Sequence, residues 1–234
     1  MELYKSLAAL IEGKALIAIT GGGGKTTLME NLGEYLKKEG YSVLITTTTK
    51  VASPVFHDYK VDFVYSDGSV FSHAAKKGES VFYASRSYDS KKWMSPELSE
   101  IEILSQLYDV VIYEADGSRG LPLKYHNWRD PVVLPSTDIV IGVMGMWGIG
   151  YKAYEMCFGD GSDTIIDTSY LNEYIRSEEG LKKGMDYSDV KMFLFNGAES
   201  ATEEQMKALK AITMPAGFIG YIASEKENIL YETL

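Results

Sequence analysis

The chain has 234 residues, 45% of them hydrophobic and 24% charged, which excludes a disordered protein and allows a full core in one domain over residues 1–234. Its formal net charge of −10 argues against nucleic acid or an anionic membrane as a partner, since both require a net basic surface. A single cysteine and the absence of a signal-peptide pattern at the N-terminus lead us to expect a cytoplasmic protein.

Short apolar runs rich in Val and Ile alternate along the chain with segments of helical periodicity. Several runs are continuous, which is typical of strands that are covered on both faces. This order predicts an α/β fold of three layers, similar to P-loop NTPases, with a mostly parallel central sheet. The expected strands are Ala15–Thr20, Ser42–Thr47, Val61–Tyr65, Ser80–Ala84, Asp109–Glu114, Asp138–Met144, Val190–Asn196 and Phe218–Ala223.

Helices are expected between these strands, with boundaries set by caps and breakers. Residues 66–95, rich in Ser, Lys and Tyr, break the alternation and are expected to form a small insertion, with a hairpin as one form. The expected helices are Thr27–Glu39, one opened by Ser95-Pro96, Thr168–Ser177, and one whose capping box pairs Ser200 with Glu203.

Four glycines, a lysine and two threonines join the first strand to the first helix. Glycine costs about 0.5–1 kcal/mol relative to alanine in regular structure, so such a run suggests that a ligand contacts the main chain. The full Walker A spacing fails because Ile19 stands at its first glycine, and the dinucleotide fingerprint fails at Thr26.

A shorter phosphate loop fits the same stretch. Main-chain N–H groups at the helix N-terminus bind phosphate oxygens, Lys25 adds a positive charge, and the Thr26 hydroxyl can ligate Mg²⁺. A tight turn without a ligand is the alternative. The predicted phosphate-binding residues are Gly21, Gly22, Gly23, Gly24, Lys25, Thr26 and Thr27.

Acidic residues follow the strand in YDVVIYEADGSRG. Because Mg²⁺ is usually held by one or two carboxylates, phosphate oxygens and water, Glu114 and Asp116 are candidate metal ligands together with Thr26. Arg119 and Lys124 come next and are candidates for contact with a terminal phosphate or an anionic substrate, with ordinary surface charge as the alternative. The predicted catalytic residues are Lys25, Glu114, Asp116 and Arg119.

Polar residues also follow the second strand, in TTTTK. Ligands of α/β sheets gather outside the carboxyl ends of strands, so Thr48 and Lys50 are expected to face the same crevice, with a Thr-rich strand as the alternative. In GMWGIGYKAY aromatic residues lie among glycines, where either an adenine or a pterin could stack or the rings pack in the core.

The stretches GGGGKTTLM, TTTTK, EADGSRGLPLK and DPVVLP, in this order and followed by a strand ending at Asn196, resemble the YqeC family of accessory proteins for selenium-dependent molybdenum hydroxylases. The shortened loop is also similar to that of the Mur ligases. The resemblance covers nearly the whole chain and implies a nucleotide-binding P-loop protein that acts in hydroxylase maturation. Its implied partner is a molybdenum hydroxylase or a protein of cofactor maturation.

By position, the resemblance places the phosphate loop at Gly21–Thr27, a second signature at Thr46–Lys50, and a third at Glu114, Asp116, Ser118 and Arg119. Asn196, at the end of a late strand, is assigned to nucleotide binding. Related P-loop proteins often carry Asn-Lys-x-Asp there, whereas this chain has Asn-Gly-Ala-Glu, which favours ATP over GTP.

Two functions follow as hypotheses. In one, the protein is a nucleotide-binding accessory factor in which Mg²⁺–ATP is hydrolysed or its phosphoryl group transferred, and the nucleotide state controls docking of a partner. In the other, it is a small-molecule kinase or ligase-like enzyme that activates an anionic substrate.

Overall fold

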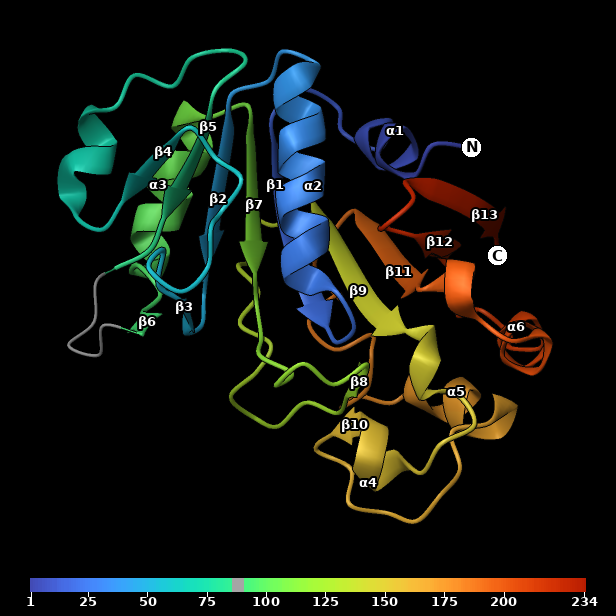
Figure 1. Cartoon of the computed structure of the whole chain (residues 1–234). Coiled ribbons are helices and arrows are strands. Elements are labelled where there is room, and N and C mark those ends of the chain that lie inside the picture. The colour runs from blue at the N-terminus through green and yellow to red at the C-terminus, as the bar shows by residue number, and fades with distance from the viewer. Residues whose placement is uncertain (86–90) are drawn as a thin grey trace.

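A computed structural model describes residues 1–85 and 91–234 of the protein (Figure 1). The strands of its central sheet are β1 (Ala15–Gly21), β2 (Val43–Thr47), β4 (Phe63–Tyr65), β5 (Ser80–Tyr83), β7 (Val110–Glu114), β9 (Ile139–Gly145), β11 (Val190–Asn196), β12 (Phe218–Ser224) and β13 (Ile229–Thr233). They form one nine-stranded sheet in the order β13-β12-β11-β9-β1-β7-β2-β5-β4. Neighbouring strands run parallel, apart from the antiparallel pair β12–β13.

Helices cover both faces of this sheet, which makes three layers. Side chains of β1 point alternately to the two faces: Ile17 and Ile19 pack with α1 (Leu3–Ala8) and α2 (Lys25–Lys38). Leu16 and Ala18 pack on the opposite face in a cluster that includes α3 (Leu98–Leu107), α5 (Thr168–Tyr174) and α6 (Glu203–Lys210). Figure 1 shows α2 in front of β1, with β7 beside it and α3 behind the β4–β5 edge. The predicted α/β fold with a mostly parallel sheet is confirmed.

Smaller elements extend from the carboxyl ends of the strands. β3 (Val51–Ala52) pairs with β6 (Lys92–Trp93), and β8 (Leu123–Lys124) pairs with β10 (Cys157–Phe158). The remaining elements are α4 (Ala153–Met156) and the 3₁₀ turns η1 (Gly68–Ser72), η2 (Met146–Gly148) and η3 (Ala198–Ser200). Within the predicted insertion 66–95, β5 belongs to the central sheet, while residues 86–90 lie outside the described residues.

Two predicted helix starts are wrong. The capping box of α6 pairs Thr202 with Gln205, not Ser200 with Glu203, because the chain first makes the turn η3. The helix expected to open at Ser95-Pro96 begins only at Leu98, after a capping box formed by Glu97 and Glu100.

Hydropathy along the described helices gives no segment that is long and apolar enough to cross a bilayer.

The parallel sheet brings the separate motifs to one edge. Glu114, the last residue of β7, lies in register with Ile19 of β1 on one side and with Thr47 of β2 on the other. The glycine loop leaves β1 at this edge, and α2 begins directly after it at Lys25.

Candidate functional site

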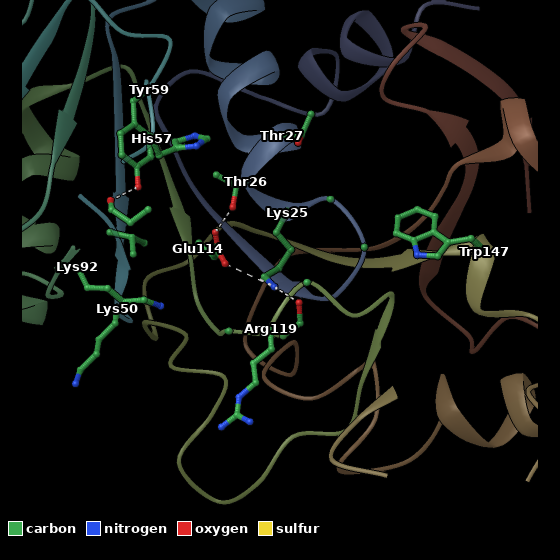
Figure 2. A pocket seen from close by; sticks show the side chains of 17 residues that line it. Lys25, Thr26, Thr27, Lys50, His57, Tyr59, Lys92, Glu114, Arg119 and Trp147 are labelled. Carbon is green, nitrogen blue, oxygen red and sulfur yellow. Dashed lines mark hydrogen bonds and ion pairs between the residues drawn. The ribbon is translucent and has the colours of Figure 1, made fainter. Parts of the chain in front are cut away.

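A cavity of about 360 Å³ lies at the carboxyl edge of the sheet (Figure 2). This volume falls in the range of about 300–1,000 Å³ that is common for small-molecule sites. Residues 23–27 of the glycine loop, Glu114 and residues 117–120 line it. Lys50, His57, Tyr59, Lys92 and Trp147 are among the other lining residues.

The main-chain N–H groups of the glycine loop fall into two sets. The first set is paired within the protein: Gly21 N–H donates to Asp116 Oδ2 (2.9 Å), Gly22 N–H to the Val143 carbonyl (2.8 Å), and Gly23 N–H to the Leu121 carbonyl (3.1 Å). In the second set, the N–H groups of residues 24–27 find no acceptor among the residues that the structure describes. Because these four groups belong to residues that line the cavity at a helix N-terminus, they can receive an anion.

Glycine is required in this loop by close backbone packing. At Gly23, φ is +71° and a Cβ atom would lie 2.2 Å from the main-chain nitrogen of Gly145. At Gly21, a Cβ atom would lie 2.3 Å from the Val143 carbonyl oxygen. The absence of a side chain at these positions therefore allows close packing against β9, in addition to the access that it would give a ligand.

Lys25 lies beneath the loop with only 4% of its surface exposed. Its Nζ donates to the Gly21 carbonyl (2.7 Å) and lies 3.2 Å from Asp116 Oδ1 and 3.6 Å from Glu114 Oε1. A contact of 3.4 Å to Ser118 Oγ completes its surroundings. The ammonium group is thus held by carboxylates at the floor of the cavity.

Thr26 and Glu114 form the part of the site that suits a divalent cation. The Thr26 hydroxyl donates to Glu114 Oε2 (2.9 Å), and the Glu114 side chain is 12% exposed and lines the cavity (Figure 2). Across the described ranges, no group of three or more His, Cys, Asp or Glu side chains could hold a metal by itself. Mg²⁺ bound by these two residues would therefore need phosphate oxygens and water to complete its shell.

Asp116 lies behind the loop and has no exposed surface. Its Oδ2 accepts the Gly21 N–H and lies 2.5 Å from His126 Nε2 and 3.9 Å from Lys124 Nζ. Burial raises the pKa of the Asp116 carboxyl, but Lys25, His126 and Lys124 together outweigh burial and lower this pKa to about 2. Asp116 is thus an ionised group that positions the loop and Lys25.

His126 lies between two hydrogen-bond acceptors in the interior. Its Nε2 faces the Asp116 carboxylate, and its Nδ1 lies 3.0 Å from the Gly180 carbonyl oxygen. The ring therefore links the loop after β7 to the segment that contains Gly180. The spacing of the histidines did not predict this role, because Gly180 lies 54 residues further along the chain.

Several predicted ligand-binding side chains point away from the cavity. Lys124 is fully buried, donates to the Gly117 carbonyl (2.7 Å) and pairs with Asp130, so it fixes the 117–120 segment. The Thr48 hydroxyl donates to the Val132 carbonyl (2.9 Å), and of the TTTTK stretch it is Lys50 that lines the cavity.

Asn196 supports the loop from its other side. Its Nδ2 donates to the Gly23 carbonyl (3.0 Å), and its Oδ1 accepts the main-chain N–H of Glu225 (3.0 Å). Asn196 does not line the cavity. It therefore ties the glycine loop to the end of β12.

His57, Tyr59 and Lys92 were not assigned to a site from the sequence, and Trp147 belongs to the stretch for which stacking of a ligand was one of two alternatives. His57 and Tyr59 come from the segment after β3, with the His57 ring held by the Glu30 carboxylate, and Lys92 comes from β6. Trp147 is 40% exposed and lies on the opposite side of the cavity from Lys50 and Lys92 (Figure 2). In the sequence, only the glycines on either side of Trp147 suggested an exposed ring instead of one packed in the core.

Comparison with known proteins places these motifs in one family. A relative from Escherichia coli (strain K12), described as "Uncharacterized protein YqeC", is 36% identical over 140 residues, which cover 58% of this chain and 54% of that protein. The match thus spans about half the length of the relative. The family model described as YqeC protein matches residues 17–159, which include the glycine loop, Glu114 and Asp116. Since this range is more than half of the chain, the protein belongs to the YqeC family.

Proposed function

We propose that the protein binds a Mg²⁺–nucleoside triphosphate, ATP in preference to GTP, at residues 21–27 and hydrolyses or transfers its terminal phosphoryl group. The observation that carries this proposal is the set of four N–H groups without an acceptor among the described residues, at residues 24–27, which line the cavity beside a buried lysine. Such a set at a helix N-terminus favours phosphate because hydrogen bonds and the helix dipole act together. The proposal thus assigns the protein to the P-loop NTPase superfamily.

The roles of the side chains follow from their positions. Thr26 and Glu114 would hold Mg²⁺, which when bound supplies charge neutralisation at the phosphates. Lys25 lies within reach of the same region and stabilises negative charge that develops during phosphoryl transfer. Asp116 and Asn196 keep the loop in place, and Trp147 offers an exposed aromatic face for a purine ring.

The preference for ATP rests on the surroundings of Asn196. Both ends of its amide already bond to the main chain, at Gly23 and Glu225, so the amide is not available to a guanine base. The chain also lacks the lysine and aspartate that follow asparagine in the guanine-reading motif.

Titration calorimetry and thermal unfolding with ATP and GTP, with and without Mg²⁺, test this proposal. Mg²⁺–ATP at a hundred times its dissociation constant should add about 2.7 kcal/mol to the stability of the wild type. Lys25→Ala should lose this effect, and Thr26→Val should lose the part that depends on Mg²⁺. Lys38→Ala, at the exposed far end of α2, is the matched control and should respond as the wild type does. If neither nucleotide at millimolar concentration shifts the unfolding temperature of the wild type, the proposal is wrong.

From the family resemblance we further propose a role in the maturation of selenium-dependent molybdenum hydroxylases, with the hydroxylase or a cofactor-maturation protein as partner. In this role the nucleotide state would control docking of the partner at residues 116–123. Measuring the rate of phosphate release with and without the hydroxylase tests this role. An equal rate in both cases would contradict it.

A small-molecule kinase or ligase-like activity is the second candidate function. It is favoured by one observation, which is that cationic side chains other than Lys25 line the same cavity. Stimulation of phosphate release by small acids, in the absence of any protein partner, would support this candidate over the first.

A further inference from the structure

We propose that the end of the cavity opposite Trp147 is a second subsite, which binds a small molecule carrying at least two anionic groups beside the terminal phosphate. This inference rests on the proposed nucleotide site and names the substrate class of that site. The subsite consists of Lys50, Lys92 and Arg119, and we call it the distal cation cluster.

The distal cation cluster is unusual for this protein because the chain as a whole is strongly acidic, with a net charge of −10. Nevertheless three cations from three separate segments line one cavity. Throughout residues 1–85 and 91–234, none of the three forms an ion pair with a carboxylate. All three side chains are exposed to solvent, so an anionic ligand in the cavity can reach them and neutralise part of their charge.

The fold holds the cluster in place. Lys50 directly precedes β3, and Lys92 lies in β6 in register with Ala52, so the β3–β6 ladder carries both lysines to the rim of the cavity. Arg119 lies on the loop after β7, with its guanidinium 5.0 Å from the centre of the Phe158 ring. Figure 2 shows Lys50 and Lys92 on the side of Glu114 that faces away from Trp147, and Arg119 below Glu114 and Lys25.

The nucleotide alone does not account for these cations. Its phosphates already have the four N–H groups of residues 24–27, the positive end of α2 and Lys25. Trp147 marks the other end of the cavity as the place for the base. A triphosphate extended from Trp147 across the loop therefore ends near Glu114, and the distal cation cluster lies beyond it.

An anionic acceptor also suits the chemistry of the site. A carboxylate or phosphate oxygen of the acceptor forms a bond to the terminal phosphorus while the bond from this phosphorus to the β–γ bridging oxygen breaks. The electron pair of the broken bond leaves with the nucleoside diphosphate. The attacking oxygen is already unprotonated at neutral pH, so the step requires no proton transfer.

The test uses the full chain saturated with Mg²⁺ and adenylyl imidodiphosphate, an ATP analogue with the β–γ bridge blocked. Succinate and inorganic phosphate are then titrated in separate calorimetric experiments, so that the two arms distinguish a carboxylate ligand from a phosphate ligand. We expect at least one of them to bind at millimolar concentration. Lys50→Gln and Lys92→Gln should each weaken this binding about tenfold, the loss of one charge-assisted hydrogen bond. Lys5→Gln, which removes an equal charge from the distant α1, should leave anion binding unchanged.

The first titration, of the analogue itself, distinguishes failure of the proposed function from failure of the subsite. If the analogue does not bind the wild type, both the proposed function and the subsite are wrong. If the analogue binds but neither succinate nor phosphate does, only the subsite is wrong. Equal anion binding by wild type, Lys50→Gln and Lys92→Gln would likewise overturn the subsite.

Discussion

Asp116 has no exposed surface, and two lysines, Lys25 and Lys124, together with the His126 ring surround its carboxylate. The same carboxylate accepts the N–H of Gly21 and so fixes the start of the glycine loop. A buried charge is stable only while its partners remain charged. These four side chains therefore act as one unit in holding the loop.

Replacing Asp116 with Asn should destabilise the protein by about 3–5 kcal/mol, because the neutral amide leaves buried cations without their counter-ion. Urea unfolding measures this change. Asp163→Asn is the matched control, since the Asp163 side chain is 82% exposed, and it should change the stability by less than about 0.5 kcal/mol. A similar small effect for both substitutions would contradict the structural role of Asp116.

Asp116 also predicts how stability depends on pH. Its folded pKa of about 2 is lower than the ordinary value of 3.8, so its ionised form stabilises the fold above pH 3.8. This contribution, about 2 kcal/mol, is lost as the pH falls from about 4 to about 2. Unfolding followed by circular dichroism across this range should give a steeper acid limb for the wild type than for Asp116→Asn. Parallel acid limbs would show that Asp116 is not the titrating group.

At the level of elements, the turn between β1 and α2 depends on glycine for steric reasons. Gly23→Ala would place a methyl group against the main chain of Gly145 in a backbone conformation with positive φ. Since main chain cannot move aside as a side chain can, we expect a loss of more than about 2 kcal/mol in stability, and of nucleotide binding. Gly161→Ala has open space around it and should cost less than about 0.5 kcal/mol in the same unfolding assay. If Gly23→Ala unfolds at the same urea concentration as the wild type, the packing of this turn is not as described.

The start of α6 gives a second test at this scale. Thr202→Ala removes the hydroxyl that accepts the Gln205 N–H and should cost about 1 kcal/mol. Ser200→Ala should cost less, since the Ser200 hydroxyl only donates to the Gly197 carbonyl in the preceding turn. Thermal unfolding compares the two variants, and a larger effect at Ser200 would contradict the assigned cap.

The sequence predicted the elements whose signal is local. Apolar runs identified the eight strands from β1 to β12 in the sheet, and the inner strands have continuous runs because they are buried on both faces, whereas the edge strand β4 is largely exposed. The edge strand β13 was missed, since only Leu230 of its five residues is buried. Ser200–Glu203 and Thr202–Gln205 both match a capping box, and the turn η3 that decides between them depends on tertiary packing.

The same distinction applies to the candidate site. The glycine loop and Glu114 could be predicted because each follows directly from a strand that ends in chemically special residues. Lys92, His57 and the burial of Lys124 could not, because their positions depend on the ladders β3–β6 and β8–β10 between distant segments. Hydroxyl groups at Thr48 matched the pattern of a ligand site but bond to the main chain instead.

On the scale of the whole molecule, two apolar clusters share one sheet. Alternate residues of β1 contribute to each cluster. If the helices on one face unfolded, they would expose the same strands on which the helices of the other face pack. We therefore expect a single cooperative unfolding transition, with equal calorimetric and van't Hoff enthalpies. Scanning calorimetry measures both, and two separate transitions would show that the chain contains more than one folding unit.

The hydrogen bonds of residues 21–23, and the contact of Asn196 with the loop, are made entirely with other parts of the protein. A free glycine segment would lose about 1–2 kcal/mol per residue in backbone entropy on wrapping around an anion. Here that ordering takes place when the chain folds. If the proposed nucleotide binds there, its encounter with the loop should require no slow rearrangement, and differences in affinity among nucleotides should appear mainly as differences in residence time.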